Sequence, residues 1–309
     1  MNFVALAGGV GGAKLADGLA KILPPESLSI VVNTGDDFDH LGLWICPDLD
    51  TVCYSLAGLS NPDSGWGRSG DTWNCLAAIQ KLGGPHWFRL GDGDIGTHLV
   101  RTFRLANGES LSAIVSNFCE SWGIRVQVFP MTDERVSTRI LTQDGIQLDF
   151  QEYFGHLQCQ PVVKAILFNG ADFAKPAPGV LAAIDAADFI LFCPSNPWVS
   201  IDPILAIPGI CEAITKKKVV AVSPIIGGKT IKGPAAKMYQ EFGIAPSALA
   251  VARHYDEIID GFIFDITDRG LESDIKCLVR NAYMTNTIML DVDSRKRLAK
   301  EVVNFCQNL

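Results

Sequence analysis

The first fourteen residues limit the fold more than any other stretch of this chain. Phe3 to Ala7 is an uninterrupted apolar run, typical of a buried strand, and it leads directly into Gly8-Gly9-Val10-Gly11-Gly12-Ala13-Lys14. An apolar period through Leu15, Leu19 and Ile22 then predicts a helix. A glycine-rich turn between a first strand and a first helix lets backbone N–H groups approach an anionic oxygen, and the helix N-terminus favours negative charge. The sequence therefore predicts a phosphate-binding loop at the start of an α/β domain.

This loop differs from the two common phosphate-binding motifs. The dinucleotide fingerprint G-x-G-x-x-G would place a third glycine where Lys14 stands, and the Walker loop would need Gly at Ala13 and Ser or Thr at Leu15. The missing third glycine disfavours an NAD-dependent oxidoreductase. A plain tight turn is the structural alternative, but four glycines in five positions followed by a lysine exceed what such a turn requires.

Composition restricts the class of protein. A chain of 309 residues with 48% hydrophobic content can bury a large core in one α/β domain, with or without an insertion. Its formal net charge of −8 argues against nucleic acid or an anionic membrane as partner. Nine cysteines are scattered singly, without a C-x-x-C pair, as is typical of reduced thiols in a cytoplasmic protein. We expect neither a signal peptide nor a membrane span, because the apolar runs are short and no basic segment precedes the first.

A second group of polar residues follows the next predicted strand. The apolar segment from Leu28 ends in Asn33-Thr34-Gly35-Asp36-Asp37, and the αβ alternation places this loop at the same sheet edge as the glycine loop. Pro47-Asp48-Leu49-Asp50-Thr51 comes next, directly before an apolar run. Two interpretations stay open here: Asp50 caps a helix, or Asp48 or Asp50 holds a divalent metal or orients a hydroxyl nucleophile.

Residues 51–125 are predicted to form a helical insertion over the carboxyl edge of the sheet. Helical periodicity occurs at about 72–82 and 97–105, and no strand of βαβ character separates the two. Three tryptophans fall in this stretch, namely Trp66, Trp73 and Trp87. They are suited to walling a flat, largely apolar ligand, although packing in a core is the commoner use of tryptophan.

A segment dense in charge and glycine, Arg89 to His98, lies within this insertion. Its Asp92 and Asp94 resemble a calcium loop only superficially, because the later ligands of an EF-hand are missing. Arg89 and His98 are interpreted either as ligand contacts or as members of local ion pairs.

The α/β alternation returns after Arg125. Strands are predicted at 125–130, 189–193, 219–222, 248–252 and 261–265, a hairpin at 139–142 with 146–149, and helices at 234–242 and 294–308. The strand at 189–193 ends in Pro194-Ser195-Asn196-Pro197. A Ser-Asn pair locked between prolines can present hydroxyl and amide groups to a ligand, and a proline-bounded turn is the alternative.

Eight short segments carry the most distinctive residues. In chain order they are GGVGGAK, VVNTGDD, PDLDT, RLGDGDIGTH, MTDERVST, CPSNPWVSIDPIL, VAVSPIIGGKTIKGPAAK and DGFIFD. In order and approximate spacing they resemble the 2-phospho-L-lactate transferase (CofD) family of coenzyme F420 biosynthesis, over nearly the whole chain. The resemblance implies a Rossmann-like three-layer α/β/α sandwich with a mostly parallel sheet. Residues 1–50 and 126–309 would form this nucleotide-binding domain, and 51–125 the small helical insertion that contributes to the deazaflavin site.

The resemblance also implies a reaction. The terminal ribityl hydroxyl of the deazaflavin 7,8-didemethyl-8-hydroxy-5-deazariboflavin (FO) would attack the acyl-bearing phosphate of a guanosine diphosphate donor, and GMP would leave. The donor would carry 2-phospholactate (LPPG) or phosphoenolpyruvate (EPPG), giving F420-0 or its dehydro form, and the cofactor would be Mg²⁺. A homodimer is a candidate assembly. Phosphoryl transfer of this kind depends mainly on charge neutralisation and alignment, which a glycine loop, a lysine, a metal and an acidic residue can provide.

Roles for particular residues follow from the same resemblance. Asp50 would be catalytic, contacting the ribityl chain of FO and orienting or deprotonating its hydroxyl, and Arg89 would also contact FO. The candidates for the guanine nucleotide and its phosphates are Gly9, Gly11, Gly12, Lys14, Thr34, Ser195 and Asn196. The candidates for metal ligation, directly or through water, are Asp48, Asp36 and Asp37.

A second hypothesis comes from a sister family with the same fold, the nucleotide-sugar-binding regulatory proteins of cell-wall metabolism, which bind without known turnover. Its members share a glycine-rich first loop and an acidic second loop. The segment PDLDT, Arg89 and the tryptophan-rich insertion favour the transferase, because a nucleotide-sugar binder has no evident need for them.

Overall fold

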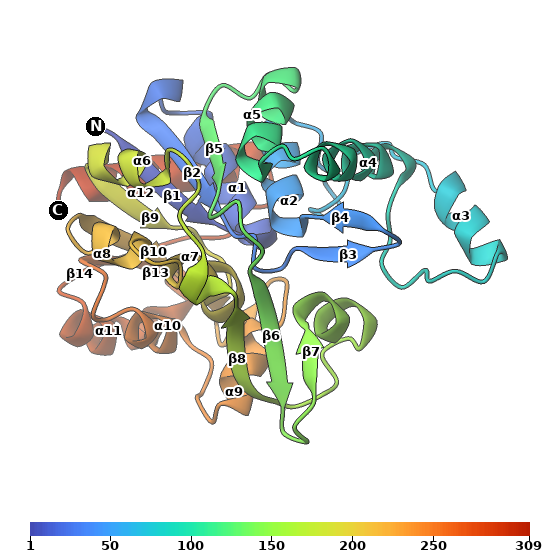
Figure 1. Cartoon of the computed structure of the whole chain (residues 1–309). Helices are drawn as coiled ribbons and strands as arrows, with labels where there is room; N and C mark the ends of the chain where they lie inside the picture. Colours follow the sequence, from blue (N-terminus) through green and yellow to red (C-terminus); the bar gives the residue numbers. More distant parts are fainter.

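The computed structural model describes all residues, 1–309. At its centre is a sheet of seven strands (Figure 1). In spatial order these are β14 (Asn281–Thr285), β13 (Gly261–Asp265), β10 (Lys218–Val222), β9 (Phe189–Phe192), β1 (Phe3–Ala7), β2 (Leu28–Val32) and β5 (Gln127–Pro130). Every neighbouring pair is parallel, so the carboxyl ends of all the strands lie at one edge. The predicted α/β class with a mostly parallel sheet is confirmed.

Strand β1 lies where the strand order reverses. It pairs with β2 on one side and β9 on the other, so that Phe3 is opposite both Leu28 and Phe189. All of β1 is buried, as its apolar sequence predicts. The crevice beyond such a reversal point is where open α/β sheets bind ligands.

Helices cover both faces of the sheet. Successive side chains of β1 point to opposite faces, so Phe3 and Ala5 join one core cluster while Val4 and Leu6 join the other. The first cluster includes residues of α1 (Gly9–Ala20), α2 (Pro47–Leu56), α5 (Leu111–Ser121) and α12 (Val292–Gln307). The second includes residues of α6 (Val180–Ala186), α7 (Asp202–Leu205), α8 (Ile210–Ile214), α9 (Ala235–Glu241), α10 (Ala248–His254) and α11 (Glu272–Leu278). The molecule is therefore a three-layer α/β/α sandwich.

Three smaller sheets flank the carboxyl edge. An antiparallel sheet in the order β7 (Gln147–Asp149), β6 (Ser137–Thr142), β8 (Val163–Asn169) lies below the main sheet in Figure 1. Two hairpins pair β3 (Phe38–His40) with β4 (Leu43–Ile45), and β11 (Ile225–Ile226) with β12 (Lys229–Thr230). The hairpin predicted at 139–142 and 146–149 is confirmed by the pairing of β6 with β7.

The region predicted as an insertion is helical. α3 (Asn74–Lys81) and α4 (Asp92–Ala106) lie to the right of the sheet in Figure 1, with α3 farthest away. By contrast α2 packs on α1, and α5 packs on β5. The proposed boundary at residue 51 falls within α2, and the division of the chain into two domains stays a prediction.

The prediction of a strand at 248–252 is wrong, because these residues belong to helix α10. Ser247 caps this helix by accepting a hydrogen bond from Ala250 N–H at 3.0 Å. Four of the five residues are buried, so the run is too uniformly apolar to show a helical period. The short strands β3, β4, β11 and β12 and the longer strands β8 and β14 were not predicted.

All nine cysteines are free thiols. None of the helices is both long and apolar enough to span a membrane.

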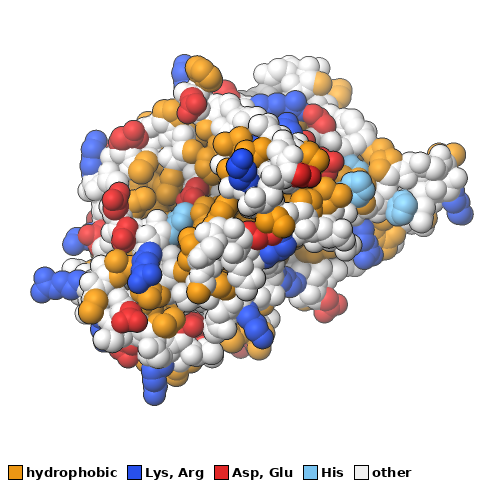
Figure 2. All heavy atoms as spheres, turned by 90° about the horizontal axis from the view of Figure 1, so that it is seen from below, with side chains coloured by type: hydrophobic (Ala, Val, Ile, Leu, Met, Phe, Trp, Pro, Cys, Tyr) orange, Lys and Arg blue, Asp and Glu red, His pale blue; other side chains and the backbone are white.

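Figure 2 shows the face seen from below Figure 1, where basic and acidic side chains are intermixed with hydrophobic ones. This face offers no continuous positive surface to a polyanion.

Candidate active site

A cavity of about 650 Å³ brings together most of the predicted site residues. Those that line it are Gly9, Gly11, Lys14, Asp36, Asp48, Asp50, Arg89, Ser195 and Asn196. Gly12 does not line it, and Thr34 and Asp37 line a separate pocket instead. The glycine loop and Asp50 thus face one cavity.

The glycine loop forms the start of α1, which begins at Gly9. The N–H of Gly9 donates to Asp48 Oδ1 at 2.7 Å, and Gly9 has the positive φ of 57° that favours glycine. The first N–H groups of a helix have no partner within the helix, so those of the residues after Gly9 are available to an anion in the cavity.

Two of these glycines are required by packing rather than by backbone conformation. A Cβ on Gly11 would lie 2.1 Å from the carbonyl oxygen of Pro194, and one on Gly12 would lie 2.5 Å from Ser195 Oγ. Ser195 Oγ in turn donates to Gly8 O at 2.7 Å. The loop after β9 is therefore packed directly on the glycine loop.

This packing predicts a large effect of Gly11→Ala. The clash is with backbone, so the two loops must move apart, and we expect the free energy of unfolding to fall by about 1–3 kcal/mol. The control is Gly96→Ala in α4, an exposed helical glycine with no atom within 4 Å of the added Cβ, which should raise stability by up to about 1 kcal/mol. Urea unfolding of both variants tests the prediction, and equal stability of the two would contradict it.

Two lysines supply positive charge at this end of the cavity. Lys14 Nζ donates to Met289 O at 2.7 Å. Burial lowers the pKa of Lys14, and the nearby charges of Arg295 and Lys232 lower it further. Lys232 Nζ donates to the carbonyls of Asp63, at 3.4 Å, and Ser64. An anionic ligand would relieve the mutual repulsion of these cations.

Acidic side chains line the cavity beside the glycine loop. Asp48 accepts from Asn33 Nδ2 at 2.9 Å as well as from Gly9 N–H. Burial raises the pKa of Asp48 to about 6, and these two hydrogen bonds oppose the rise. Burial also raises the pKa of Asp36 well above its usual range, and the charge of Asp48 adds to the effect. One oxygen of Asp36 is buried without a hydrogen-bond partner.

No three or more acidic, histidine or cysteine side chains are grouped to hold a metal ion by themselves. Mg²⁺ is usually held by one or two carboxylates together with the phosphates of the substrate. Asp36 and Asp48 fit that requirement, because they are near each other and line the cavity next to the glycine loop.

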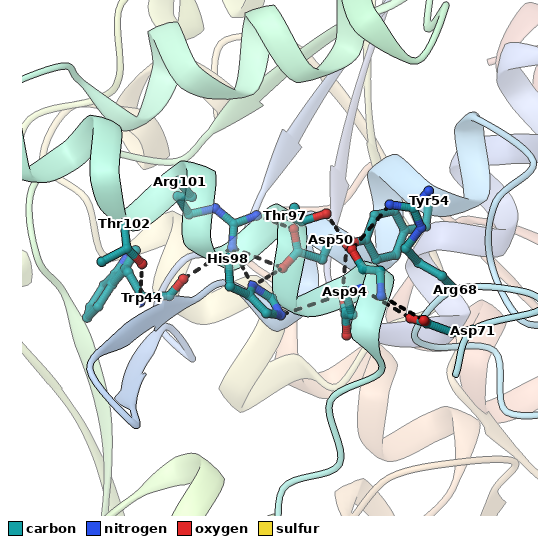
Figure 3. A network of polar contacts seen from close by, with 11 residues as sticks. Trp44, Asp50, Tyr54, Arg68, Asp71, Asp94, Thr97, His98, Arg101 and Thr102 are labelled. Atoms are coloured by element: carbon teal, nitrogen blue, oxygen red, sulfur yellow. Dashed lines mark hydrogen bonds and ion pairs between the residues drawn. The ribbon is translucent and has the colours of Figure 1, made fainter. Parts of the chain in front are cut away.

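Asp50 belongs to a buried polar network between α2 and α4 (Figure 3). It does not cap α2, whose N-cap residue is Cys46, so the capping interpretation is wrong. Its two oxygens face the guanidinium of Arg101, with Nη1 donating to Oδ2 at 3.1 Å and Nη2 paired with Oδ1. His98 and Asp94 continue the network along α4, as Figure 3 shows.

Aromatic side chains form another wall of the cavity. Trp66, Trp87, Phe88 and Phe154 line it. Arg89 lies over the ring of Trp73 at 4.6 Å, so it makes a cation–π contact in place of a local ion pair. These flat faces next to Arg89 suit a planar ligand.

The sequence interpretation missed Arg101, Asp94, Tyr54 and Lys232. A signal for Arg101 was present, because Asp94, His98 and Arg101 are spaced so that they share one face of a helix. We predicted α4 to begin at residue 97, which hid this face, whereas the helix begins at Asp92.

Comparison with known proteins identifies the family of this chain. The sequence profile of a family described as "2-phospho-L-lactate transferase CofD" matches residues 3–307. The chain belongs to this family. The CofD-family resemblance inferred from the eight segments is therefore confirmed.

Several relatives are similar over most or all of their length. A "Phosphoenolpyruvate transferase" of Streptomyces griseus is 42% identical over 316 residues, covering 100% of this chain and 99% of the relative. One of Thermobifida fusca is 46% identical over 281 residues, covering 87% of each. A "2-phospho-L-lactate transferase" of Methanosarcina mazei is 39% identical over 300 residues, covering 97% of this chain and 99% of the relative.

A solved structure supports the fold. A protein of the UPF0052 family from Bacillus halodurans superposes with a TM-score of 0.64 at 18% identity, covering 98% of both chains. At 18% identity this likeness shows the fold of the chain and nothing further.

Proposed function

We propose that this protein is a transferase that joins FO to the acyl-bearing phosphate of a guanosine diphosphate donor. The ribityl hydroxyl oxygen bonds to that phosphorus, and the bond from the phosphorus to the oxygen bridging it to GMP breaks. GMP leaves with the bridging oxygen, the hydroxyl proton is released, and the product is a phosphodiester. The names of the relatives support transfer of a phosphoenolpyruvyl or phospholactyl group.

One observation carries the proposal: the glycine loop with Lys14 and the carboxylate of Asp50 line the same cavity. The helix N-terminus and the lysines favour a diphosphate at one end. Trp87, Phe88 and Arg89 favour a flat ring in another part of the cavity, and Asp50 can accept a hydrogen bond from a hydroxyl between the two. This arrangement aligns the two reactants, which is the main requirement of phosphoryl transfer.

Asp36 and Asp48 would hold Mg²⁺, which when bound neutralises charge on the diphosphate. Lys14 binds a donor oxygen and Asp50 orients the attacking hydroxyl.

For the donor we propose the enolpyruvyl form. Six relatives that are 40–46% identical are named phosphoenolpyruvate transferases, whereas two named 2-phospho-L-lactate transferases are 38–39% identical. The difference in identity is small, so the experiment compares both donors.

The decisive experiment incubates purified protein with FO, Mg²⁺ and each donor in turn, and identifies products by mass spectrometry. We expect dehydro-F420-0 and GMP from EPPG, and a lower rate of F420-0 formation from LPPG. No product from either donor, together with tight binding of a UDP-sugar, would instead support the nucleotide-sugar-binding alternative. A faster reaction with LPPG would reverse the donor assignment alone.

A further inference from the structure

The carboxylate of Asp50 is held from behind by a side chain that does not line the cavity. Arg101 is the largest fully buried side chain of the protein, with 1% of its surface exposed. Its guanidinium contacts both oxygens of Asp50, and Nη1 also donates to Trp44 O at 3.3 Å. A fork with two contacts fixes the plane of a carboxylate, which a single contact cannot do.

The same guanidinium determines the tautomer of His98. Arg101 Nη1 lies 3.1 Å from His98 Nδ1, and an arginine can only donate. Nη1 has two hydrogens and three acceptors within 3.3 Å, namely Nδ1, Asp50 Oδ2 and Trp44 O, so one N–H is shared. With Nδ1 accepting, a neutral ring carries its proton on Nε2. Nε2 lies 3.5 Å from Asp94 Oδ1 and has no hydrogen-bond partner. His98 Nδ1 and Asp50 Oδ2 are 3.6 Å apart, too far for a hydrogen bond, and Arg101 bridges them.

Asp94 completes the network on the far side of His98. Tyr54 Oη donates to Asp94 Oδ1 at 2.7 Å and is 2.8 Å from Thr97 Oγ1. Two carboxylates thus flank the cationic Arg101 and neutral His98, and all are supplied by α2 and α4 (Figure 3).

We propose that Arg101 is a positioning residue that, with His98 as its Nε2–H tautomer, holds the Asp50 carboxylate in the orientation needed to accept the FO hydroxyl. The inference rests on the proposed function. It also means that the position of α4, which packs on β4 and α5, controls the geometry at Asp50, because α4 carries Arg101.

Arg101→Lys tests the fork while keeping the charge. We expect kcat to fall about 10- to 100-fold, while KM for the donor changes less than threefold, because the ammonium cannot contact both oxygens. Arg104→Lys is the matched control, since Arg104 is on the same helix, is paired with exposed Glu109 and does not line the cavity. Its kcat should equal that of the unmodified protein. An unchanged kcat in Arg101→Lys, or an equal loss in Arg104→Lys, would overturn the proposal.

A double-mutant cycle with Asp50→Asn separates positioning from general structural damage. If Arg101 acts through Asp50, adding Arg101→Lys to Asp50→Asn should lower kcat by less than threefold further. If the kcat loss of the double variant equals the product of the two single losses, the proposal is overturned. Because the unmodified protein is assayed in parallel, its failure to form product would refute the proposed function instead.

A measurement on the unmodified protein does not depend on whether a variant folds. In ¹⁵N-histidine NMR near neutral pH, the His98 signal, assigned by its loss in His98→Gln, should have the nitrogen shifts of the neutral Nε2–H tautomer. An Nδ1–H tautomer or a doubly protonated ring would show that Arg101 does not contact Nδ1, and would overturn the proposal.

Discussion

Asp50→Asn should lower turnover of FO by about 10²-fold or more. The amide oxygen can still accept a hydrogen bond, but the negative charge that orients the attacking hydroxyl is lost. We expect KM for the donor to change little, because the contacts of Asp50 are with Arg101 and His98 and not with the glycine loop. Steady-state kinetics with FO and donor varied separately would measure both effects. Near-normal turnover would remove Asp50 from the mechanism.

The same substitution should also destabilise the protein. Asn leaves the buried guanidinium of Arg101 without its anionic partner, a change that typically costs about 3–5 kcal/mol. The kinetic assays should therefore be run well below the melting temperature of the Asp50→Asn variant. Asp202→Asn is a suitable control, because it breaks the ion pair with His254, at 2.9 Å, without touching the cavity. It should lower stability and leave turnover unchanged, whereas Asp50→Asn should lower both.

Lys14→Ala should raise KM for the donor about 10- to 100-fold, the range expected for losing a hydrogen bond to a charged group. Lys14 Nζ is bonded to Met289 O and is close to other cations, and a phosphate oxygen is the partner that best compensates this crowding. FO affinity, measured by quenching of its fluorescence, should stay within about threefold because Lys14 is bonded to Met289 O and not to Asp50 or Arg89, the residues assigned to FO.

Lys21→Ala provides the comparison for Lys14→Ala. Lys21 follows the same helix and pairs with Asp17, outside the cavity, so its loss should leave KM for the donor unchanged. Equal weakening of FO and donor binding in Lys14→Ala would mean that the glycine loop is not the donor site.

Much of the sheet could be predicted because its strands are short apolar runs next to glycine or polar loops. Phe3 to Ala7 and Phe189 to Phe192 are examples, and both are central strands. The run at 248–252 has the same composition but is helical, because its cap at Ser247 outweighs the apolar pattern. The order of the strands is a matter of long-range pairing, which local patterns do not contain.

Part of the site was predictable because its residues directly follow these apolar strands. Residues at strand ends, such as Ser195 and Asp36, are placed by the parallel sheet, and they line the cavity. The contact between Asp50 and Arg101 joins residues 51 positions apart, from helices whose docking no local pattern specifies. Gly12 looked like a ligand contact because glycine serves both close packing and ligand approach, and in this loop it is packed under Ser195.

The central place of β1 bears on how the chain folds during synthesis. Its residues leave the ribosome long before those of β9, one of its two neighbours, which begins only at Phe189. Until then one edge of this wholly apolar strand has no native partner, which exposes it to wrong pairing and to aggregation. We expect slow folding dominated by this late pairing, since contacts between distant segments form slowly. Nascent chains that stop short of β9 should therefore need chaperones, whereas those that include it should not.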